Sequence, residues 1–598
     1  MRQKSVQRPS QPRIPLTIEG IDVNRCSNPS CVNFDIEAST SRSDVNYSVS
    51  GNKRNGSSLR CKKCGGFNSI KSNKAIAEEL ERMEALKERS TIYRQDGTAC
   101  HKLDCPNFGK RFTAHPDLYK LNGKTSKGKQ RLKCLCCKTS FTHQSDKRKS
   151  HPDSKSHQNV TLFRLLVNDM SINRIMEVTE LSAPTIYRKI DMFYERCISF
   201  AYHRERNLRQ MKLEFMRLST DRQEYHVNWS NRKDKKNIIL NAIGTADKAS
   251  RYVFGMDVNY DPCMSLDEIE GTAEFELDTL LKDYNREFAR VWTTNDYQLS
   301  KNLSGELAAK QKDLIIRFSS QPLPLSDIGF DYFKEQLSVD YGLDAFGHNS
   351  STKLPQNGVL VHSEYTMYAH FMKLASLIGH AEGLRFYLDK EPAINRACHL
   401  AFADNVLEGT AHSLYVKINK TLTVDQRRAL VNASQIFVKQ VQEENCVDEE
   451  EARKIIALHS IENPITFKDK SDNWYTLPID KIYECQKYVS FLTPIQSVKH
   501  EQLAMMLLDA SLHPIDNFFQ IVRRRLSSLE RPISTSSNAG RVWTGKSPYN
   551  PAMINKLLQI LRVFYNYCYI SKTDGLTAAE RIGLAKGAVE IRKILYPW

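Results

Sequence analysis

Two sets of four cysteines near the N-terminus have the residue type and spacing of structural zinc sites. In each set a C-x4-C pair is followed about 30 residues later by a C-x2-C pair, and the two sets repeat in register. Four thiolates close a tetrahedral zinc site and leave no open position for catalysis. Unrelated free thiols would not explain such a repeat. The predicted ligands are Cys26, Cys31, Cys61 and Cys64 in the first set and Cys100, Cys105, Cys134 and Cys137 in the second.

We expect each set to fold as a small zinc ribbon, at 20–70 and at 96–143. Zinc should stabilise both ribbons directly, because so short a module buries little core. His101 and Cys136 are alternative ligands in the second ribbon. The other six cysteines are scattered singly, which is typical of reduced core residues.

Three carboxylates in the second half of the chain have the chemistry of a site for two Mg²⁺ ions. Asp221 and Glu364 each come at the end of an apolar run, and Asp516 opens a helical segment. Carboxylate oxygens suit hard cations, and a pair of such ions can clamp the attacking and leaving oxygens of a phosphodiester. Arg523, seven residues after Asp516 on the same helix face, could contact phosphate. Each acid alone is more simply a turn former or a helix cap, so the prediction depends on their common position.

The hydrophobic pattern predicts the elements that must position these acids. Their order is that of a ribonuclease-H-like fold, a mixed α/β sheet with helices on both faces. In that topology the first and fourth strands end side by side, which would bring Asp221 to Glu364, and the last helix supplies the third acid. The predicted elements are strands at 213–221, 237–244 and 252–258, a helix at 264–290, a strand at 358–364 with a helix at 366–379, and a strand at 384–388 with a helix at 391–404.

Between the cysteines and the acids the sequence predicts helices. Residues 71–95 contain a connecting helix, and 159–200 have the apolar spacing of three short helices around one core, the layout of a helix-turn-helix. Ser171 and Ser182 are the expected N-caps, with Pro184 in the first turn of the third helix. A small helical spacer with a solvated basic face is the alternative. The third helix would present to a major groove Thr185, Tyr187, Arg188 and Lys189.

The net charge also differs between the first part of the chain, which contains the cysteines, and the second part, which contains the three acids. The chain has 598 residues and a formal charge of +17, but residues 1–220 hold 41 basic and 22 acidic residues, and residues 221–598 hold 45 and 47. A uniformly basic protein is therefore excluded, and the first part should meet a polyanion such as DNA. The chain has no run of 18 apolar residues and no apolar segment behind its polar start, so we expect neither a membrane span nor a signal peptide.

Two stretches resemble bacterial insertion-sequence transposases of the DDE type. One is Val361-His-Ser-Glu-Tyr-Thr-Met-Tyr-Ala-His-Phe371 with Leu384-Arg-Phe-Tyr-Leu-Asp389, and the other runs from Ile515-Asp-Asn-Phe-Phe to Tyr549-Asn-Pro551. Tandem zinc ribbons and a helix-turn-helix ahead of the catalytic domain also suit such proteins. The resemblance covers most of the chain, except parts of 290–352 and 412–500.

The resemblance also implies a reaction, binding partners and a location in the cell. It implies Mg²⁺- or Mn²⁺-dependent cleavage and transfer of DNA strands at the ends of an insertion element, with two catalytic ions. The partners would be double-stranded DNA, both terminal repeats and target, and further copies of the chain, because two ends must be brought together. The expected location is the cytoplasm of a bacterium, at the nucleoid.

The acids depart from the usual pattern of that family. Its second acid is usually Asp, where this chain has Glu364 with Asp389 as a nearby rival. Its third is more often Glu, where this chain has Asp516 with Glu530 as an alternative. The remaining predicted boundaries are a catalytic core at 211–404, an inserted subdomain at 405–500 and final helices of the core at 501–598.

Two other functions fit parts of the sequence. One is a DNA-binding regulator, a domesticated derivative with an inactive nuclease core, which would tend to lose at least one carboxylate. The other is a zinc-ribbon nuclease of another nucleic-acid process, such as defence. The complete set of acids favours an active transposase.

Overall fold

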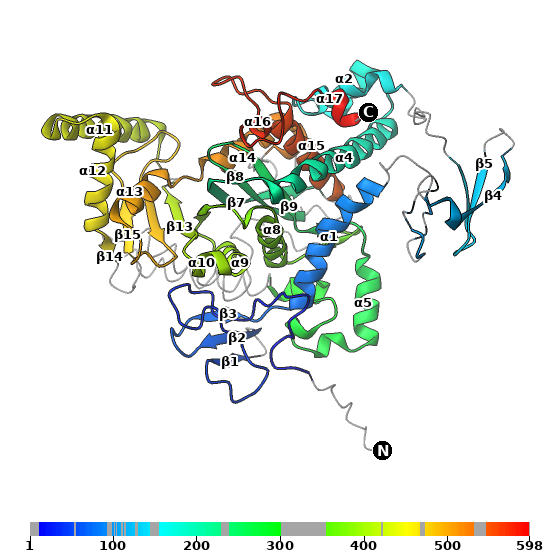
Figure 1. The fold of residues 1–598 in the computed structure, drawn as a ribbon, viewed down its shortest axis with the longest axis horizontal. Helices are drawn as coiled ribbons and strands as arrows, with labels where there is room; N and C mark the ends of the chain where they lie inside the picture. The colour runs from blue at the N-terminus through cyan, green and yellow to red at the C-terminus, as the bar shows by residue number, and fades with distance from the viewer. Residues whose placement is uncertain are drawn as a thin grey trace, which may run out of the picture.

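The computed structural model is a multidomain α/β protein with a central mixed sheet (Figure 1). Among the described residues, none of the helices combines the length and apolar composition that a membrane crossing requires. The described residues are 11–52, 56–92, 99–100, 102, 105–108, 110, 112, 115–125, 130–143, 155–228, 238–300, 354–419, 422–466, 473–530 and 546–596.

The central sheet has eight strands in the order β14-β15-β16-β13-β12-β7-β8-β9. Strands β7, β8 and β9 are successively antiparallel, β12 is parallel to β7, β13 is parallel to β12, and β16 is antiparallel to β13. Most residues of β8, β9 and β12 are buried, because helices cover both faces. The strands are β7 (Phe215–Val227), β8 (Ile238–Asp247), β9 (Val253–Val258), β12 (Gly383–Asp389), β13 (Ala411–Ile418), β14 (Ile465–Thr466), β15 (Asn473–Thr476) and β16 (Lys487–Phe491).

The strand predicted at 358–364 does not enter this sheet. Only Val359–Leu360 forms a strand there, β11, which pairs with β10 (Tyr260–Asp261) in a separate two-stranded sheet. This apolar run is buried beside the 259–292 segment, which contains α5 (Leu266–Phe275) in place of the long helix predicted at 264–290, and the N–H of Trp292 donates to the carbonyl of Leu360 at 2.9 Å. The strand that follows β9 in the central sheet is therefore β12.

Helices from distant parts of the chain cover the two faces of the sheet. On one face the ring of Phe371 in α8 meets Phe386 of β12 edge-on, with centroids 6.3 Å apart. On the other face α14 approaches β8 at Gly244, where an added Cβ would lie 2.6 Å from Met256 Sδ and 2.9 Å from Ile515 Cδ1, so a larger residue would require these side chains to shift. These helices are α8 (Ser363–Ile378), α9 (Pro392–Ala401) and α14 (His513–Arg525).

The open edge of the sheet at β9 is covered by α15 (Ala552–Tyr567). The side chain of Asn566 accepts from the N–H of Val253 at 3.0 Å and donates to its carbonyl at 2.9 Å, and Gln559 donates to the carbonyl of Met256 at 2.8 Å. Side-chain amides thus take the place of a further strand and satisfy the exposed backbone of β9.

The predicted helices between the cysteines and the sheet are present. Ser171 and Ser182 have the extended backbone of N-caps, although neither side chain makes a capping hydrogen bond. The third helix is longer than the sequence suggested, because its second half packs against α15, with the rings of Phe200 and Tyr567 5.0 Å apart. We call α2, α3 and the first part of α4 the three-helix unit. The helices are α1 (Asn73–Ile92), α2 (Asn159–Leu166), α3 (Ile172–Thr179) and α4 (Ala183–Glu205).

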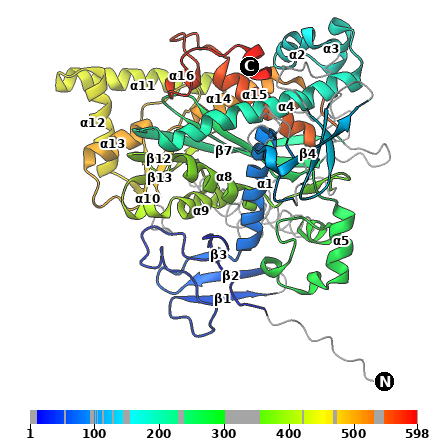
Figure 2. The ribbon, with the colours of Figure 1, turned by 45° about the vertical axis from the view of Figure 1, so that its right-hand side comes forward.

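The predicted boundary of the inserted subdomain at residue 405 comes before the last parallel strand of the central sheet. Strand β13 lies inside 405–500, yet it pairs with β12 in the central sheet. Beyond it the helices α11 and α12 project from one end of the molecule (Figure 2), and Asp448 caps α12 by accepting from the N–H of Glu451 at 2.9 Å. The helices are α11 (Val424–Asn445), α12 (Glu449–Glu462) and α13 (His500–Asp509).

Candidate metal centres and carboxylate cavity

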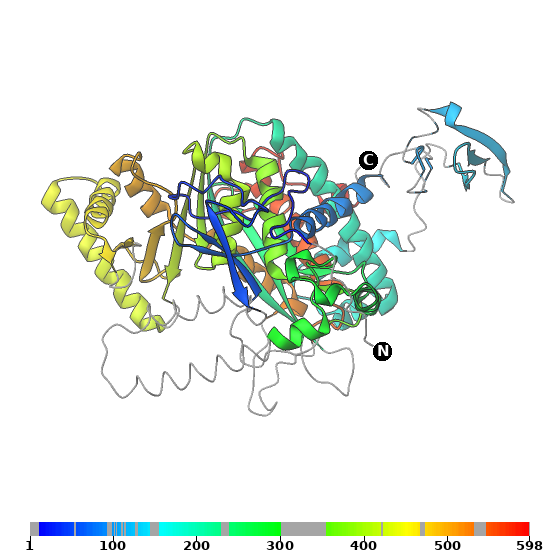
Figure 3. The same ribbon diagram turned by 90° about the horizontal axis from the view of Figure 1, so that it is seen from below.

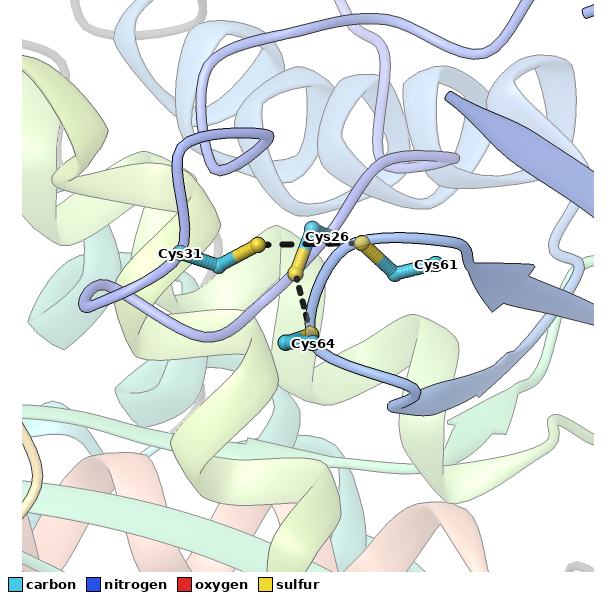
Figure 4. A group of neighbouring side chains, drawn as sticks. All are labelled: Cys26, Cys31, Cys61 and Cys64. Carbon is cyan, nitrogen blue, oxygen red and sulfur yellow. Dashed lines mark hydrogen bonds between the residues drawn. The ribbon is translucent and has the colours of Figure 1, made fainter. Parts of the chain in front are cut away.

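The first predicted set of four cysteines comes together in the structure (Figure 4). The sulfurs of Cys26 and Cys64 are 3.6 Å apart and those of Cys31 and Cys61 are 3.7 Å apart. Four sulfurs placed tetrahedrally at 2.3 Å from zinc would be separated by about 3.8 Å. The set can therefore hold a zinc ion. We call it, with β1 (Tyr47–Asn52), β2 (Gly56–Cys61) and β3 (Phe67–Ser69), the first cysteine unit.

The second set has the same geometry. The sulfurs of Cys100 and Cys137 are 3.4 Å apart and those of Cys105 and Cys134 are 3.8 Å apart. Cys136 is exposed and does not belong to the group of converging sulfurs, and His101 lies outside the described residues. With β4 (Tyr119–Lys124), β5 (Gln130–Cys134) and β6 (Ser140–Thr142), this set forms the second cysteine unit, which can also hold zinc.

Two residues beside each set of sulfurs repeat with the cysteines, although neither was predicted from the sequence. The side-chain amide of Asn33 donates to Cys61 Sγ at 3.3 Å, and that of Asn107 donates to Cys134 Sγ at 3.5 Å. Tyr47 and Tyr119 each accept from the N–H of the first cysteine of their set at 3.0 Å. Such outer contacts orient metal ligands. Their signal was present in the sequence, because each Asn stands two residues after the second cysteine.

Hydrogen bonds lower the pKa of Cys61 in the first unit and those of Cys134 and Cys137 in the second. Burial raises the pKa of the Cys61 thiol, but donated N–H groups of Cys64 and Lys63 outweigh it and bring that pKa to about 7. Hydrogen bonds from the side chain and backbone of Thr139 lower the pKa of Cys137 to about 6. Thiolate is the form that binds metal, so the lowered pKa values favour zinc binding at these sulfurs. Burial raises the pKa values of Cys26, Cys31, Cys100 and Cys105.

The first cysteine unit is docked on the sheet body through α9. The buried ring of Phe34 meets His399 edge-on, with centroids 6.4 Å apart, and His399 Nδ1 donates to the carbonyl of Ser27 at 3.1 Å. Because that carbonyl can only accept, Nε2 of the neutral ring accepts from the hydroxyl of Ser413, 2.6 Å away. Burial lowers the pKa of His399 to about 4, so the ring is neutral at pH 7. Arg396 adds a hydrogen bond to Ser69 at 3.1 Å.

The second cysteine unit stands apart from the body (Figures 1 and 3). Its β4–β5 ribbon exposes basic side chains and Leu121, which is 60% exposed. The exposed basic residues are Lys120, Lys124 and Arg131.

A cavity of about 330 Å³ lies where β7, the end of β12 and the segment after α14 meet. Its lining combines carboxylates with an arginine, as expected of a site that binds cations and phosphate together. The lining residues are Asp221, Arg222, Gln223, Glu224, Tyr225, His226, Asp389, Glu391, Arg523, Leu529 and Glu530. We call it the carboxylate cavity.

The register of the sheet places Asp221 and Asp389 side by side. Leu388 of β12 pairs with Thr220 of the parallel strand β7, so the next residues along the two strands are Asp389 and Asp221. Side chains alternate along a strand. The hydroxyl of Ser219, on the same face as Asp221, donates to the carbonyl of Ser511 just before α14 at 2.8 Å. Asp221 and Asp389 therefore belong to the α14 face.

Arg523 enters the cavity from the last turn of α14. With the Gln223 amide oxygen facing the guanidinium, that oxygen accepts from Nη2 and Nε at 2.7 Å each. Burial raises the pKa of the neighbouring Tyr225, and the charge of Arg523 opposes that shift. Arg222, on the adjacent position of β7, is paired with Glu391 at 3.2 Å. Glu530 follows a short 3-10 turn, Ser527–Leu529, and is paired with Lys546 at 3.3 Å.

The structure does not bring Glu364 or Asp516 into this cavity. Thr220, which faces away from Asp221, bonds to Thr245, and Thr245 bonds to His370 of α8 at 2.8 Å, so α8 covers the opposite face. Glu364 lies in the first turn of α8 and is paired there with Lys71. Asp516 lies in the first turn of α14, two turns before Arg523. Of the residues predicted for the phosphodiester site, Asp221 and Arg523 line this cavity, together with the alternatives Asp389 and Glu530.

The residues predicted to face a DNA groove separate into two groups. Tyr187 and Arg188 are exposed on α4 and Thr185 is half-buried. Lys189 is only 3% exposed, and its ammonium donates to Asn159 of α2 at 2.6 Å. It follows Ile186 by three residues on the helix, which places it on the inward face.

No protein-family model matches the chain, and a search of curated proteins found no match. The function is therefore inferred from the geometry of the cavity and the cysteine units.

Proposed function

We propose that the chain is a DDE-type transposase, which binds the ends of an insertion element and cuts and joins DNA strands with Mg²⁺ or Mn²⁺. The observation that carries the proposal is the cavity whose lining includes Asp221, Asp389, Glu530 and Arg523. These three acids also have the usual order of the family, two Asp and a Glu. We therefore assign the catalytic acids to Asp221, Asp389 and Glu530, in place of Glu364 and Asp516.

The strand order supports this proposal. Three antiparallel strands, β7 to β9, followed by the parallel strands β12 and β13 beside β7, agree with a ribonuclease-H-like core. In such a core the first strand and the end of the fourth carry the first two acids. Asp221 on β7 and Asp389 at the end of β12 fit these positions.

The proposed chemistry proceeds in two steps. In the first, the oxygen of water attacks phosphorus at the element end, the bond from phosphorus to the 3′ oxygen breaks, and a 3′-hydroxyl is released. In the second, this hydroxyl attacks a target phosphodiester, whose own 3′ oxygen leaves. Bound divalent ions would activate the attacking oxygen and stabilise the leaving one. Asp221, Asp389 and Glu530 would hold those ions, and Arg523 would hold a phosphate oxygen.

The basic first part of the chain supports DNA as the substrate. Residues 20–70 and 96–143, which contain the cysteine units, account for 10 of its 19 excess positive charges, whereas residues 159–200 hold five basic and five acidic residues. We propose that the three-helix unit acts as a helix-turn-helix, with the exposed Tyr187 and Arg188 toward DNA. Lys189 has no place in this proposal, because it is buried.

The test is cleavage of a supercoiled plasmid that carries the DNA flanking the gene. Wild-type protein should cut it only with Mg²⁺ or Mn²⁺. Asp221→Asn and Glu530→Gln should lower the rate by at least about 10³-fold with DNA binding intact, because a lost ligand removes transition-state charge stabilisation. Asp516→Asn, the matched control, should cut within a few-fold of wild type. Metal-dependent DNA binding without any cleavage would contradict the enzyme proposal and favour a regulator.

A further inference from the structure

One short segment of the chain contacts both the carboxylate cavity and the three-helix unit. Arg523 at its start and Glu530 at its end line the cavity. Between them, Arg525 ends α14 and contacts the turn that follows α2. Residues two apart on a helix point about 200° apart, so Arg523 and Arg525 face opposite ways from one turn.

Arg525 is held on several sides. Its Nη1 donates to the side-chain oxygen of Asn168 at 2.8 Å and to the carbonyl of Val167 at 3.3 Å. Its own carbonyl accepts from the N–H of Asp169 at 2.8 Å. The guanidinium lies 4.9 Å from the ring centroid of Tyr569, a distance at which cation–π attraction acts.

This anchor matters because Glu530 has an exposed side chain and lies beyond the end of the helix. Leu526 and Leu529 are buried and hold the segment against the core, but apolar contacts do not fix a carboxylate along the cavity. The directional bonds to Asn168 and Asp169 do fix the segment, five residues before Glu530. Contacts that orient metal ligands from outside typically change metal affinity by about 10- to 100-fold.

We infer that Arg525 is a positioning residue: it ties the 523–530 segment to the turn after α2 and so sets the affinity of the carboxylate cavity for a divalent cation. The inference rests on the proposed function, since it requires that the cavity bind such a cation. The three-helix unit would then have a second role besides DNA binding: it would hold in place the segment that carries Glu530.

The experiment measures Mn²⁺ binding by electron paramagnetic resonance on the full-length, zinc-loaded protein. The variants are Arg525→Ala, Arg525→Lys and, as a matched control, Arg524→Ala, whose side chain is exposed on the same turn. Asp221→Asn identifies the signal of the cavity. We expect Arg525→Ala to raise the Mn²⁺ dissociation constant about 10-fold or more with the number of sites unchanged. Arg524→Ala should leave the constant within two-fold of wild type. Arg525→Lys should recover part of the loss, because lysine keeps one donor but not the fork.

Two results would overturn the inference while the proposed function stands. The first is equal Mn²⁺ affinity in Arg525→Ala and Arg524→Ala, with binding lost in Asp221→Asn. The second is a lower number of sites at unchanged affinity in Arg525→Ala, which would show that the residue acts on stability alone. If Asp221→Asn binds Mn²⁺ as wild type does, the cavity is not a metal site, and both the proposed function and the inference fail.

Discussion

The two cysteine units share one design and differ in what surrounds them. Both place four sulfurs at the spacing of a zinc site, with an Asn amide and a Tyr hydroxyl in matching positions. The first is docked on α9 through Phe34 and His399, whereas the second stands apart. Of two copies of one module, the first therefore packs on the sheet body, and the second remains accessible to a binding partner. We expect the first unit to matter most for stability and the second for DNA binding.

The largest effect should come from removing ligands. Cys31→Ser with Cys61→Ser should destabilise the sheet body by about 3 kcal/mol, because Phe34 is no longer buried and His399 loses its hydrogen bond. The matched pair, Cys105→Ser with Cys134→Ser, should leave the melting temperature of the body within about 1 °C. Calorimetry and zinc analysis measure both, and each pair should lower the zinc content from two ions to one. Equal destabilisation by the two pairs of substitutions would contradict the view that only the first cysteine unit stabilises the sheet body.

A smaller effect should appear in DNA binding. Replacing Lys120, Lys124 and Arg131 of the second unit by Ala should weaken plasmid binding about 10-fold at 150 mM salt. It should also reduce the slope of log affinity against log salt by roughly 0.9 for each phosphate that the variant no longer neutralises. The same number of changes in the first unit, at the exposed Arg60, Lys62 and Lys63, should weaken binding less, because that unit is docked. Fluorescence anisotropy across a salt series compares the two. A larger effect from the first unit would reverse the assignment.

The smallest effect concerns the turn after each C-x2-C pair. Gly65 and Lys138 occupy equivalent positions with φ of 74° and 61°, a left-handed conformation that costs a non-glycine residue about 1 kcal/mol. Lys138→Gly should therefore raise the zinc affinity of the second unit about five-fold, and Gly65→Lys should lower that of the first by a similar factor. Competition with a chelating dye measures both constants. Unchanged constants would mean that the turn relaxes without strain.

The sequence predicted the cysteine units well because their signal is local. The two cysteines of each ligand pair are separated by only two or four residues, so their proximity does not depend on the rest of the fold. The catalytic acids depend instead on which apolar run enters the sheet. Val359–Leu360 forms the short strand β11 outside the central sheet, so Glu364 does not follow a strand of that sheet, whereas Asp389 ends its strand β12.

The second difference between prediction and structure concerns which face of a helix a residue occupies. Lys189 was expected to face a DNA groove with Thr185, Tyr187 and Arg188, yet its spacing of three from Ile186 places it inside, where Asn159 accepts its hydrogen bond. Likewise the spacing of Asp516 and Arg523 correctly put them on one helix but did not reveal where along the sheet that helix meets the cavity. Such facts depend on contacts between distant segments, which spacing in one segment does not contain.

The most direct test of the account compares Asp389→Asn with Glu364→Gln in plasmid cleavage with Mg²⁺. Both variants neutralise one carboxylate, and zinc content and melting temperature verify that both are folded. We predict that Asp389→Asn lowers the rate by at least about 10³-fold, whereas Glu364→Gln remains within a few-fold of wild type. Loss of cleavage in Glu364→Gln with activity retained in Asp389→Asn would contradict the assignment of the carboxylate cavity as the active site.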